Sequence, residues 1–528
     1  MNSNKVNMRV RLGLLIVLVL AVSAAVSAAV SGPTIHLDLI GRYETGVFAE
    51  GAAEIVAFDA GSARLFVINA NAGRVDVLDL SDPATPALLS PIDLPEFSGG
   101  VNSVAVHDGL VVVAAENEEK TEPGQAVFLD TDGTLLNAVT VGALPDMVTF
   151  TPDGRYVLVA NEGEPNDDYD VDPEGSVSII DLSGGVANLT QAHVQTASFV
   201  KFNNRPIDPL IRIFGPNATV AQDLEPEYIA ISADSRIAWV TLQENNALAI
   251  IDIASANVVA LRALGLKDHS QPGNGLDASD RDDAINIANW PVHGMFMPDA
   301  IAAFTSRSQQ YLITANEGDA RDYDGYAEEA RVKDLDLDPT AFPNANDLQE
   351  DEAIGRLNVT TAQGDVDGDG DFDALWSYGA RSFSIWNRQG KLVFDSGDQF
   401  EQTIATLLPD EFNADSEEND TFDNRSDNKG PEPEGVVVGV VNGRTYAFIG
   451  LERIGGIMVY DVTNASSPHV VQYINTRDFS GDAEAGTAGD LAPEGLTFVP
   501  ASDSPTGQPL LIVGYEVSGS VAIFSIEN

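Results

Sequence analysis

Seven times along the chain, a carboxylate or amide side chain stands at the start of a short apolar segment with the pattern of a β-strand. These side chains are Glu54, Asn102, Asp146, Glu227, Asp299, Glu434 and Glu494. Each is followed within about twenty residues by a second β-rich segment, as hairpin-connected strands would be. The recurrence predicts a repeat protein in which every repeat contributes one antiparallel β-meander.

The second strand of each repeat ends in a polar residue of its own. This second series comprises Asn71, Glu116, Glu162, Glu244, Glu317, Glu452 and Glu516. A radial β-propeller explains both series, because the innermost strand of each blade starts on one face of the disc and the second strand returns to it. We therefore expect the two series to meet around the mouth of the central channel.

The predicted fold is all-β: a seven-bladed β-propeller closed by an N-terminal strand, with long loop insertions on one face. The last repeat shows only three strands, and the alternating segment 35–43 could supply its fourth and remove the free sheet edges. Repeat starts lie 44 to 135 residues apart, against about 40 to 50 for an undecorated blade. The excess predicts insertions near 183–222, 254–298 and 319–430 within a single domain spanning 30–528.

The first thirty residues have the pattern of a secretory signal. Three basic residues precede an apolar run at 12–22 and small residues at 23–29. We predict a signal peptide over 1–29 and an exported protein, periplasmic or extracellular, without a transmembrane segment after cleavage. The chain contains no cysteine, which excludes disulfides and thiolate metal ligands and favours oxygen ligands for hard cations.

The net charge of −53, from 81 acidic and 28 basic residues, argues against a nucleic-acid partner, which would need a basic surface. Many of these acids could simply keep the protein soluble in salty or calcium-containing surroundings. Acids gathered at a channel mouth are different, because two carboxylates about 7 Å apart repel by about 2 kcal/mol at an effective dielectric near 20. They would be protonated or hold cations, unless they only accept backbone N–H bonds from neighbouring blades.

An aspartate-rich segment carries the strongest short motif in the chain. Its carboxylates are Asp365, Asp367, Asp369, Asp371 and Asp373. Acids at alternating positions around Gly370 let one tight loop turn several oxygens toward a single Ca²⁺. Trp376 stands where an EF-hand has its bidentate glutamate. We predict a calcium loop of another type that pins the long insertion, with a solvated acidic turn as the alternative.

We predict that Ca²⁺ binds at the channel mouth, where a second divalent or iron ion is an alternative. The candidate ligands there are Glu54, Asp146, Glu162, Glu227, Asp299, Glu317, Glu434, Glu452, Glu494 and Glu516. Lys429 and Arg321 are placed where they could hold a phosphate or carboxylate substrate beside the metal, although a surface ion pair explains each equally well. Asp277 and its neighbours lead into Asp299, which predicts that their loop overhangs the same mouth.

Several longer motifs resemble those of one protein family. Segments 160–178, 225–229, 315–323, 430–436 and 492–496 are similar to the choice-of-anchor I domain proteins, and the resemblance covers residues 35–528. These exported bacterial propellers are often labelled mesenchyme-specific cell surface glycoprotein-like, and some relatives are described as atypical alkaline phosphatases. The resemblance implies a seven-bladed propeller, export and a calcium-dependent phosphatase activity, but it carries over no set of catalytic residues.

The leading functional hypothesis is an exported, divalent-metal-dependent phosphoesterase, alkaline phosphatase-like, acting on a small phosphorylated substrate at the channel mouth. Glu434, Glu227 and Asp299 are the candidate catalytic carboxylates, and Lys429 or Arg321 would clamp the substrate. Serine nucleophile chemistry is not indicated, because the chain lacks a Gly-x-Ser-x-Gly elbow. The alternatives are a non-catalytic, calcium-stabilised surface, adhesion or ligand-binding propeller and a lactonase-like calcium hydrolase.

Overall fold

The computed structural model describes residues 35–94, 97 and 99–527, so the predicted signal peptide at 1–29 lies outside the described residues. Within the described part, β-strands dominate and the α-helices are short. The helices are α2 (Val220–Asp223), α3 (Ala345–Leu348) and α4 (Gln399–Leu407). None of the helices in this part is both long and apolar enough to span a bilayer.

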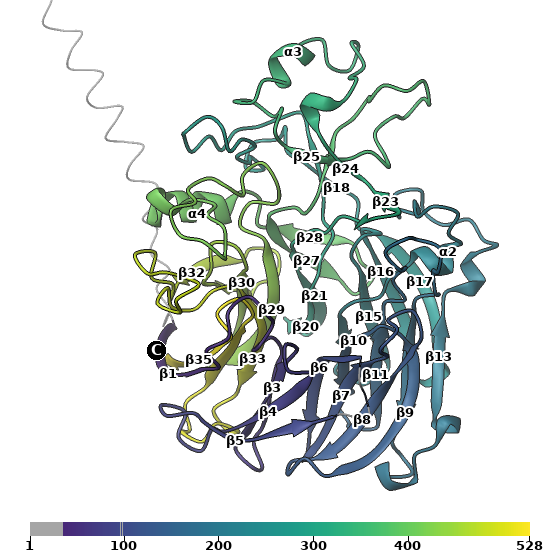
Figure 1. Cartoon of the computed structure of the whole chain (residues 1–528), viewed down its shortest axis with the longest axis vertical. Helices are drawn as coiled ribbons and strands as arrows, with labels where there is room; N and C mark the ends of the chain where they lie inside the picture. Colours follow the sequence, from purple (N-terminus) through teal and green to yellow (C-terminus); the bar gives the residue numbers. More distant parts are fainter. Residues whose placement is uncertain (1–34, 95–96, 98, 528) are drawn as a thin grey trace, which may run out of the picture.

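Seven four-stranded antiparallel sheets form the body of the molecule, and Figure 1 shows them splayed around a common centre. The first four sheets are β2 (Val56–Asp59), β3 (Arg64–Asn69), β4 (Arg74–Asp79), β5 (Ala87–Asp93); β6 (Gly100–His107), β7 (Leu110–Glu116), β8 (Pro123–Asp130), β9 (Leu135–Ala143); β10 (Pro145–Phe150), β11 (Tyr156–Asn161), β12 (Ser176–Asp181), β13 (Val194–Ser198); and β14 (Ile229–Ile231), β15 (Ile237–Leu242), β16 (Ala247–Asp252), β17 (Asn257–Ala263). The other three are β20 (Ile301–Ser306), β21 (Gln309–Asn316), β27 (Ser382–Asn387), β28 (Leu392–Asp395); β29 (Pro433–Val441), β30 (Arg444–Leu451), β31 (Ile457–Asp461), β32 (His469–Ile474); and β33 (Pro493–Val499), β34 (Leu510–Tyr515), β35 (Ser520–Glu527) with β1 (His36–Glu44). The arrangement is all-β and propeller-like.

The N-terminal strand completes the last of these sheets. β1 pairs antiparallel with β35, from His36 opposite Glu527 to Glu44 opposite Ser520. The predicted pairing of segment 35–43 with the final repeat is therefore confirmed, with the strand shifted by one residue. Chain ends that are far apart in sequence thus lie in one sheet.

The hydrophobic core is divided among the spaces between successive sheets. Strands β11 and β12 are buried along almost their whole length because a neighbouring sheet covers each of their faces. The same packing joins the last sheet to the first, where Ile512 and Ile523 share a cluster with Leu65 and Val67. Alternating apolar residues on the second and third strands of each sheet therefore supply most of the burial.

The first strands of the sheets lie side by side in the order β2, β6, β10, β14, β20, β29 and β33, and β33 lies against β2. Two glycines allow this close approach. A Cβ atom on Gly435 would lie 2.0 Å from the Glu494 carbonyl oxygen, and one on Gly495 would lie 2.5 Å from that of Glu54. Glycine after the acid therefore lets β29 and β33 pack against the acid-bearing backbone of the next sheet.

The predicted insertions were drawn too wide. Strand β13 lies inside 183–222, β17 inside 254–298, and both β27 and β28 inside 319–430, so each range contains strands of its own sheet. The reason is exposure: β13 and β17 are outer strands with polar or half-exposed residues at many positions, which weakens their apolar pattern.

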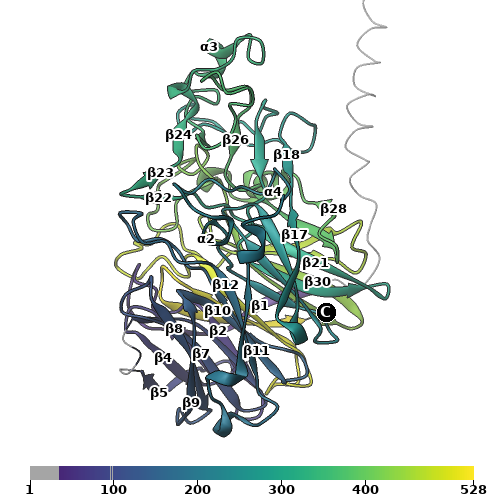
Figure 2. The same cartoon turned by 90° about the vertical axis from the view of Figure 1, so that its right-hand side faces the viewer.

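The remaining inserted segments build an accessory sheet above the body, visible with α3 at the top of both Figure 1 and Figure 2. Its five strands, in spatial order, are β18 (Leu266–Asp268), β19 (His293–Met295), β26 (Trp376–Ser377), β25 (Asn358–Thr360) and β24 (Glu329–Arg331). A separate hairpin pairs β22 (Asp322–Tyr323) with β23 (Tyr326–Ala327). The accessory sheet has its own apolar cluster, including Phe342, Leu357 and Val359.

Candidate functional site

The two polar series lie at the same end of the sheets, as expected. Glu434 and Glu494 are the second residues of β29 and β33. Antiparallel pairing sets Pro433 opposite Leu451 and Pro493 opposite Tyr515. Glu452 and Glu516 directly follow those partners in the sequence. Each second strand therefore returns its acid to the level at which the neighbouring first strand begins.

A cavity of about 90 Å³ lies between the first strands. Its polar lining includes five of the seven residues of the first series, Asn102, Asp146, Asp299, Glu434 and Glu494, together with Ser103. Ile55, Met147, Tyr228, Val436 and Leu496 contribute apolar walls. Acids that are up to several hundred residues apart in the chain thus face one small space.

We call Glu54, Asp146, Glu227, Asp299, Glu434 and Glu494 the channel carboxylates. Among the described residues, no lysine, arginine or histidine forms an ion pair with any of them within 4.0 Å. The Oε2 atoms of Glu227, Glu434 and Glu494 are buried and have no hydrogen-bond partner. Buried polar atoms are nearly always hydrogen-bonded in proteins, so these oxygens call for a partner of another kind.

Burial and mutual repulsion raise the pKa values of these groups. Burial, followed by repulsion from Glu516 and Asp146, raises the pKa of Glu54 to about 8. Burial, followed by repulsion from Glu164, raises the pKa of Asp146 to about 7. Burial is also the first cause, and neighbouring carboxylates a further one, of raised pKa values at Glu162, Glu227, Glu244, Asp299, Glu434, Glu452, Glu494 and Glu516. At neutral pH the cluster must therefore share protons or hold cations.

The donor set of the channel fits a hard cation. Carboxylate, amide and hydroxyl oxygens supply its polar lining, which contains no histidine and no thiolate, and this is the chemistry that Ca²⁺ and similar divalent ions prefer. The unpartnered Oε2 atoms of Glu227, Glu434 and Glu494 are free to become ligands without breaking a hydrogen bond.

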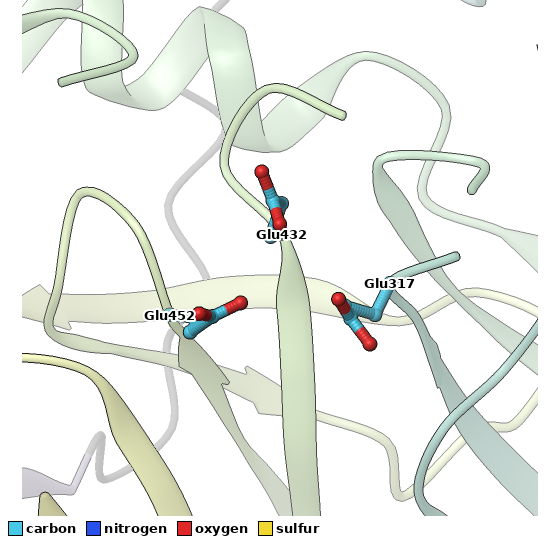
Figure 3. Close-up of side chains that lie close together, drawn as sticks. All are labelled: Glu317, Glu432 and Glu452. Carbon is cyan, nitrogen blue, oxygen red and sulfur yellow. The ribbon is translucent and has the colours of Figure 1, made fainter. Parts of the chain in front are cut away.

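A second group of acids lies beside the channel and is organised differently. Glu317, Glu432 and Glu452, which we call the three-glutamate group, each place a carboxylate oxygen within 4.8 Å of the other two (Figure 3). The ammonium group of Lys429 lies 2.5 Å from Glu317 Oε1 and 3.2 Å from Glu432 Oε2. This group therefore carries an internal cation.

Two arginines complete the compensation. Arg453 lies 3.1 Å from Glu432 and 3.0 Å from Glu452, and Arg425 lies 2.7 Å from Glu432. Burial alone would raise the pKa of Glu432, but Lys429, Arg453 and Arg425 outweigh it and lower that pKa well below its usual value. The three-glutamate group is thus a salt-bridge network rather than a set of free ligands.

Arg321 is not positioned as a substrate clamp. Its guanidinium group pairs with Asp223 and, at 2.8 Å, with Glu225, while Nη1 donates to the Tyr169 hydroxyl at 3.3 Å. The side chain is only 2% exposed and stacks on Phe214. Every guanidinium nitrogen already donates to a protein group, so a clamp role, which stays a prediction, would require breaking one of these contacts.

The two loops with near-identical sequences, 161–169 and 316–323, lie against each other. The rings of Tyr169 and Tyr323 meet edge to face with centroids 5.6 Å apart. Nearby, the Gly325 amide donates to the Asp167 carbonyl at 2.8 Å. The loops place Glu162 and Glu317 at the ends of β11 and β21, so their packing fixes two acids of the second series.

The aspartate-rich loop does not gather its five acids around one point. Asp365, Asp367 and Asp369 form one exposed group, whereas Asp371 and Asp373 form another with Asp338. The division arises because a parallel bridge between Leu337 and Phe372 brings Asp338 alongside the loop. The calcium loop stays a prediction, with its five acids divided between two groups, and Asp338 was not identified from the sequence.

Two further acids belong to the site region and were not predicted from the sequence. Glu432 is the centre of the three-glutamate group, and Glu225 pairs with Arg321. Both occur in Glu-Pro-Glu triplets, one ending at Glu227 and the other at Glu434. The triplet was the available signal, because it places one acid on each side of the proline at the start of a first strand.

Comparisons with known proteins agree on the family. The profile of the choice-of-anchor I domain matches residues 54–465. Gigasin-3a of Magallana gigas is 33% identical over 192 residues, which are 34% of this chain and 67% of that protein. Mesenchyme-specific cell surface glycoprotein of Strongylocentrotus purpuratus is 27% identical over 292 residues, 49% of this chain and 37% of that protein.

Among solved structures, the Myceliophteria thermophila Cps50 (Swd1) beta-propeller domain aligns with a TM-score of 0.42 at 10% identity, covering 93% of this chain and 98% of that one. The family profile extends over most of the chain, from the first channel carboxylate to the sixth sheet. The chain belongs to the choice-of-anchor I domain family.

Proposed function

We propose that this protein is an exported, surface-associated, closed seven-bladed β-propeller that binds divalent cations in its central channel. The observation that carries the proposal is the set of buried, unpartnered carboxylate oxygens on Glu227, Glu434 and Glu494. Closure is supported by the contact of β33 with β2 and by the hydrogen bond from the Thr497 hydroxyl to the Val56 carbonyl at 2.6 Å.

Export and surface association rest on three lines of support. The N-terminal sequence has the composition of a secretory signal. The chain belongs to the choice-of-anchor I family, and a partly matching relative is named a cell surface glycoprotein. Secretion of the full-length chain, followed by N-terminal sequencing of the mature protein, tests this part directly.

A cation is the simplest solution to the electrostatics of the channel. Each pair of ionised carboxylates about 7 Å apart would contribute about 2 kcal/mol of repulsion. No described side chain of opposite charge is paired with the channel carboxylates, in contrast to the three-glutamate group. Glu434 and Glu494 would hold the ion, with Asp146 and Asp299 on the same lining. Glu227 has an unpartnered oxygen and is repelled by Asp299 and Asp146, and it would complete the ligand set. When bound, the ion would neutralise the acids and supply a Lewis acid at the channel.

The size of the cavity favours ions over organic ligands in its interior. At about 90 Å³, it is far smaller than typical ligand pockets of about 300 to 1,000 Å³. A larger ligand would have to bind at the mouth, above the acids.

The test is elemental analysis of the purified full-length protein combined with calcium titration of metal-free material. We expect bound divalent ions in the native protein and a lower content in the double variant Glu434→Gln, Glu494→Gln. Glu484→Gln, at an exposed acid away from the channel, is the matched control. Native protein free of divalent cations, or equal calcium binding by all three proteins, would refute the proposal.

A metal-dependent phosphoesterase is the second candidate. The observation that favours it is the presence of carboxyl groups with pKa values near neutrality, Glu54 at about 8 and Asp146 at about 7, close to the channel. Such groups can exchange protons at physiological pH. Glu434, Glu227 and Asp299 would orient the ion and the substrate, and Lys429 is the one predicted clamp that remains near the acids.

Hydrolysis assays separate the candidates. The full-length protein is incubated with p-nitrophenyl phosphate or nucleotides in the presence of Ca²⁺, Mn²⁺ or Fe, and with a panel of lactones for the lactonase alternative. An enzyme should lose turnover in Glu434→Gln while its fold is retained. Calcium binding without hydrolysis of any of these compounds would leave the binding propeller as the function.

A further inference from the structure

The structure contains a second concentration of buried oxygen ligands away from the channel lining. It lies where the connection between β18 and β19 meets helix α4 and the loop at 409–428. Asp277 and Asn413 are fully buried, and Asp423 is 2% exposed. We propose that Asp277, Asn413 and Asp423 form an internal divalent-cation site, with Ca²⁺ as the expected ion.

Arg381 carries the positive charge at this junction and is already paired with a carboxylate. Arg381 pairs with Glu401 at 2.7 Å and also donates to the Asp277 carbonyl at 2.6 Å. The other oxygen of Glu401 accepts from the Asp277 amide at 3.1 Å. Glu401 and Arg381 therefore neutralise each other, and no described ion pair involves the carboxylates of Asp277 or Asp423.

Asn413 supplies an observation independent of the acids. Its Nδ2 donates to Glu401 at 3.1 Å and to the Ser426 hydroxyl at 2.8 Å, whereas its Oδ1 is buried without a hydrogen-bond partner. Exchanging the amide nitrogen and oxygen would set Oδ1 against the Glu401 carboxylate, so the hydrogen bonds fix the orientation. A buried amide oxygen without a donor is suited to coordinate a cation.

Asp423 is connected to Asn413 through the same serine. The Ser426 hydroxyl donates to Asp423 Oδ1 at 2.5 Å, and Asp423 Oδ2 is buried without a partner. Burial is the main cause that raises the pKa of Asp423 to about 8, and Asp277 and Asp282 add repulsion. Burial likewise raises the pKa of Asp277 to about 7. The Asp277 oxygens accept the Ser279 and Asn286 amides but have no cationic partner. Two carboxylates without an ion pair and one amide oxygen form the oxygen-rich, sulfur-free ligand set that Ca²⁺ takes.

The Asp277 loop was predicted to overhang the channel mouth, and in the structure Asp277 is hydrogen-bonded to Glu401 of α4 and to Arg381. An ion here would tie the β18–β19 connection to the 409–428 loop, since Asp277 comes from the first and Asn413 and Asp423 from the second. The loop that carries Asp423 continues directly to Lys429 and Glu432 of the salt-bridge network. An ion at this site would therefore restrain the loop that leads into the salt-bridge network, independently of any ion in the channel.

The experiment counts calcium ions in the full-length protein and two variants. Metal-free protein is titrated with Ca²⁺ by isothermal calorimetry, and elemental analysis gives the ions per chain. We expect Asp423→Asn to bind one Ca²⁺ fewer than the natural protein and to gain less thermal stability from Ca²⁺. The control Asp283→Asn, an exposed aspartate of the neighbouring loop, should retain the full count.

A second variant keeps the test decisive if Asp423→Asn does not fold. Asp277→Asn removes the charge of the other carboxylate without changing the side-chain shape and should weaken calcium binding at one site by about tenfold. If Asp423→Asn keeps the full calcium count, or if Asp277→Asn leaves every calcium affinity unchanged, the site does not exist and the two aspartates share a proton instead. Loss of the same ion in Glu434→Gln would also overturn the proposal, because the site would then be part of the channel.

Discussion

The three-glutamate group and the channel carboxylates contain the same residue types at neighbouring positions, yet they carry their charge in opposite ways. Glu432 and Glu434 are two residues apart. Lys429, Arg425 and Arg453 surround Glu432. Glu434 has a buried oxygen with no partner. Internal cations lower the pKa of the first acid, whereas burial and repulsion raise that of the second.

This difference separates structural acids from candidate ligands. A carboxylate that already has three basic partners gains little from a metal ion. A buried carboxylate without a partner destabilises the protein unless a proton or a cation joins it. A count of acidic residues alone does not distinguish the three-glutamate group from the channel carboxylates.

The largest effect is expected from removing the internal cation. Lys429→Met should destabilise the protein by about 3 to 5 kcal/mol, because Glu317 would lose its ion pair and Glu432 one of its three. Urea unfolding in a chelator measures the loss. Lys429→Arg keeps the charge and should cost much less. A loss below about 1 kcal/mol would mean that this group is no better compensated than the channel.

The second-largest loss of stability is expected from removing divalent ions, and its size should depend on pH. The pKa values of Glu54 and Asp146, about 8 and about 7, exceed those of the unfolded chain, so the folded state holds protons that the unfolded state releases. Metal-free protein should therefore be most stable near pH 4 to 5 and should lose stability as the pH rises toward 8. Calcium at about a hundred times its dissociation constant should restore about 3 kcal/mol at the upper end.

Thermal unfolding in chelator and in calcium across this pH range provides the measurement. The calcium-dependent gain should grow with pH, because Ca²⁺ competes with protons for the same oxygens. A melting midpoint in chelator that stays constant from pH 5 to 8 would contradict the raised pKa values.

A smaller effect on stability is expected from substituting Glu434, and its sign should differ between chelator and calcium. In chelator, Glu434→Gln should stabilise the protein by about 2 kcal/mol because it removes one repelling charge. In calcium the same variant should lose part of the calcium-dependent gain. Glu432→Gln should instead destabilise the protein in both conditions, because it leaves Arg425 and Arg453 with less compensation. Equal signs for the two variants would erase the proposed distinction.

The smallest effect on stability is expected from a partly exposed ion pair. Lys120 and Glu164 form an ion pair of 3.1 Å with side chains about one third exposed. Lys120→Ala should change the free energy of unfolding by less than about 1 kcal/mol, since solvent screens such pairs. A larger loss in the same urea experiment would show that this partly exposed ion pair stabilises the protein as the buried pairs of the three-glutamate group do.

Much of the fold was predictable because the second and third strands of a sheet, such as β11 and β12, are buried on both sides. The starts of β10, β29 and β33 carry the acids that marked the repeats, and the alternating N-terminal segment pairs with β35 as predicted. The outer strands β13 and β17 were not predicted, because their half-exposed residues give no strong apolar pattern.

The site was predictable only as a list of acids. Burial of Arg321 between Asp223 and Glu225 could not be predicted, because these residues lie 98 and 96 positions away. Similarly, Asp338 joins Asp371 and Asp373 through a pairing between Leu337 and Phe372 that no local pattern indicates.

The amino-acid sequence by itself determined the repeats, the order of their strands and the gathering of acids at one end of each repeat, since strand periodicity and turn chemistry are local properties. Only the tertiary structure decided which of those acids receive a positive partner. Lys429 and Glu317 are 112 residues apart in the chain and 2.5 Å apart in space. Charge compensation depends on that second distance, because Coulomb energy follows separation in space and the local dielectric.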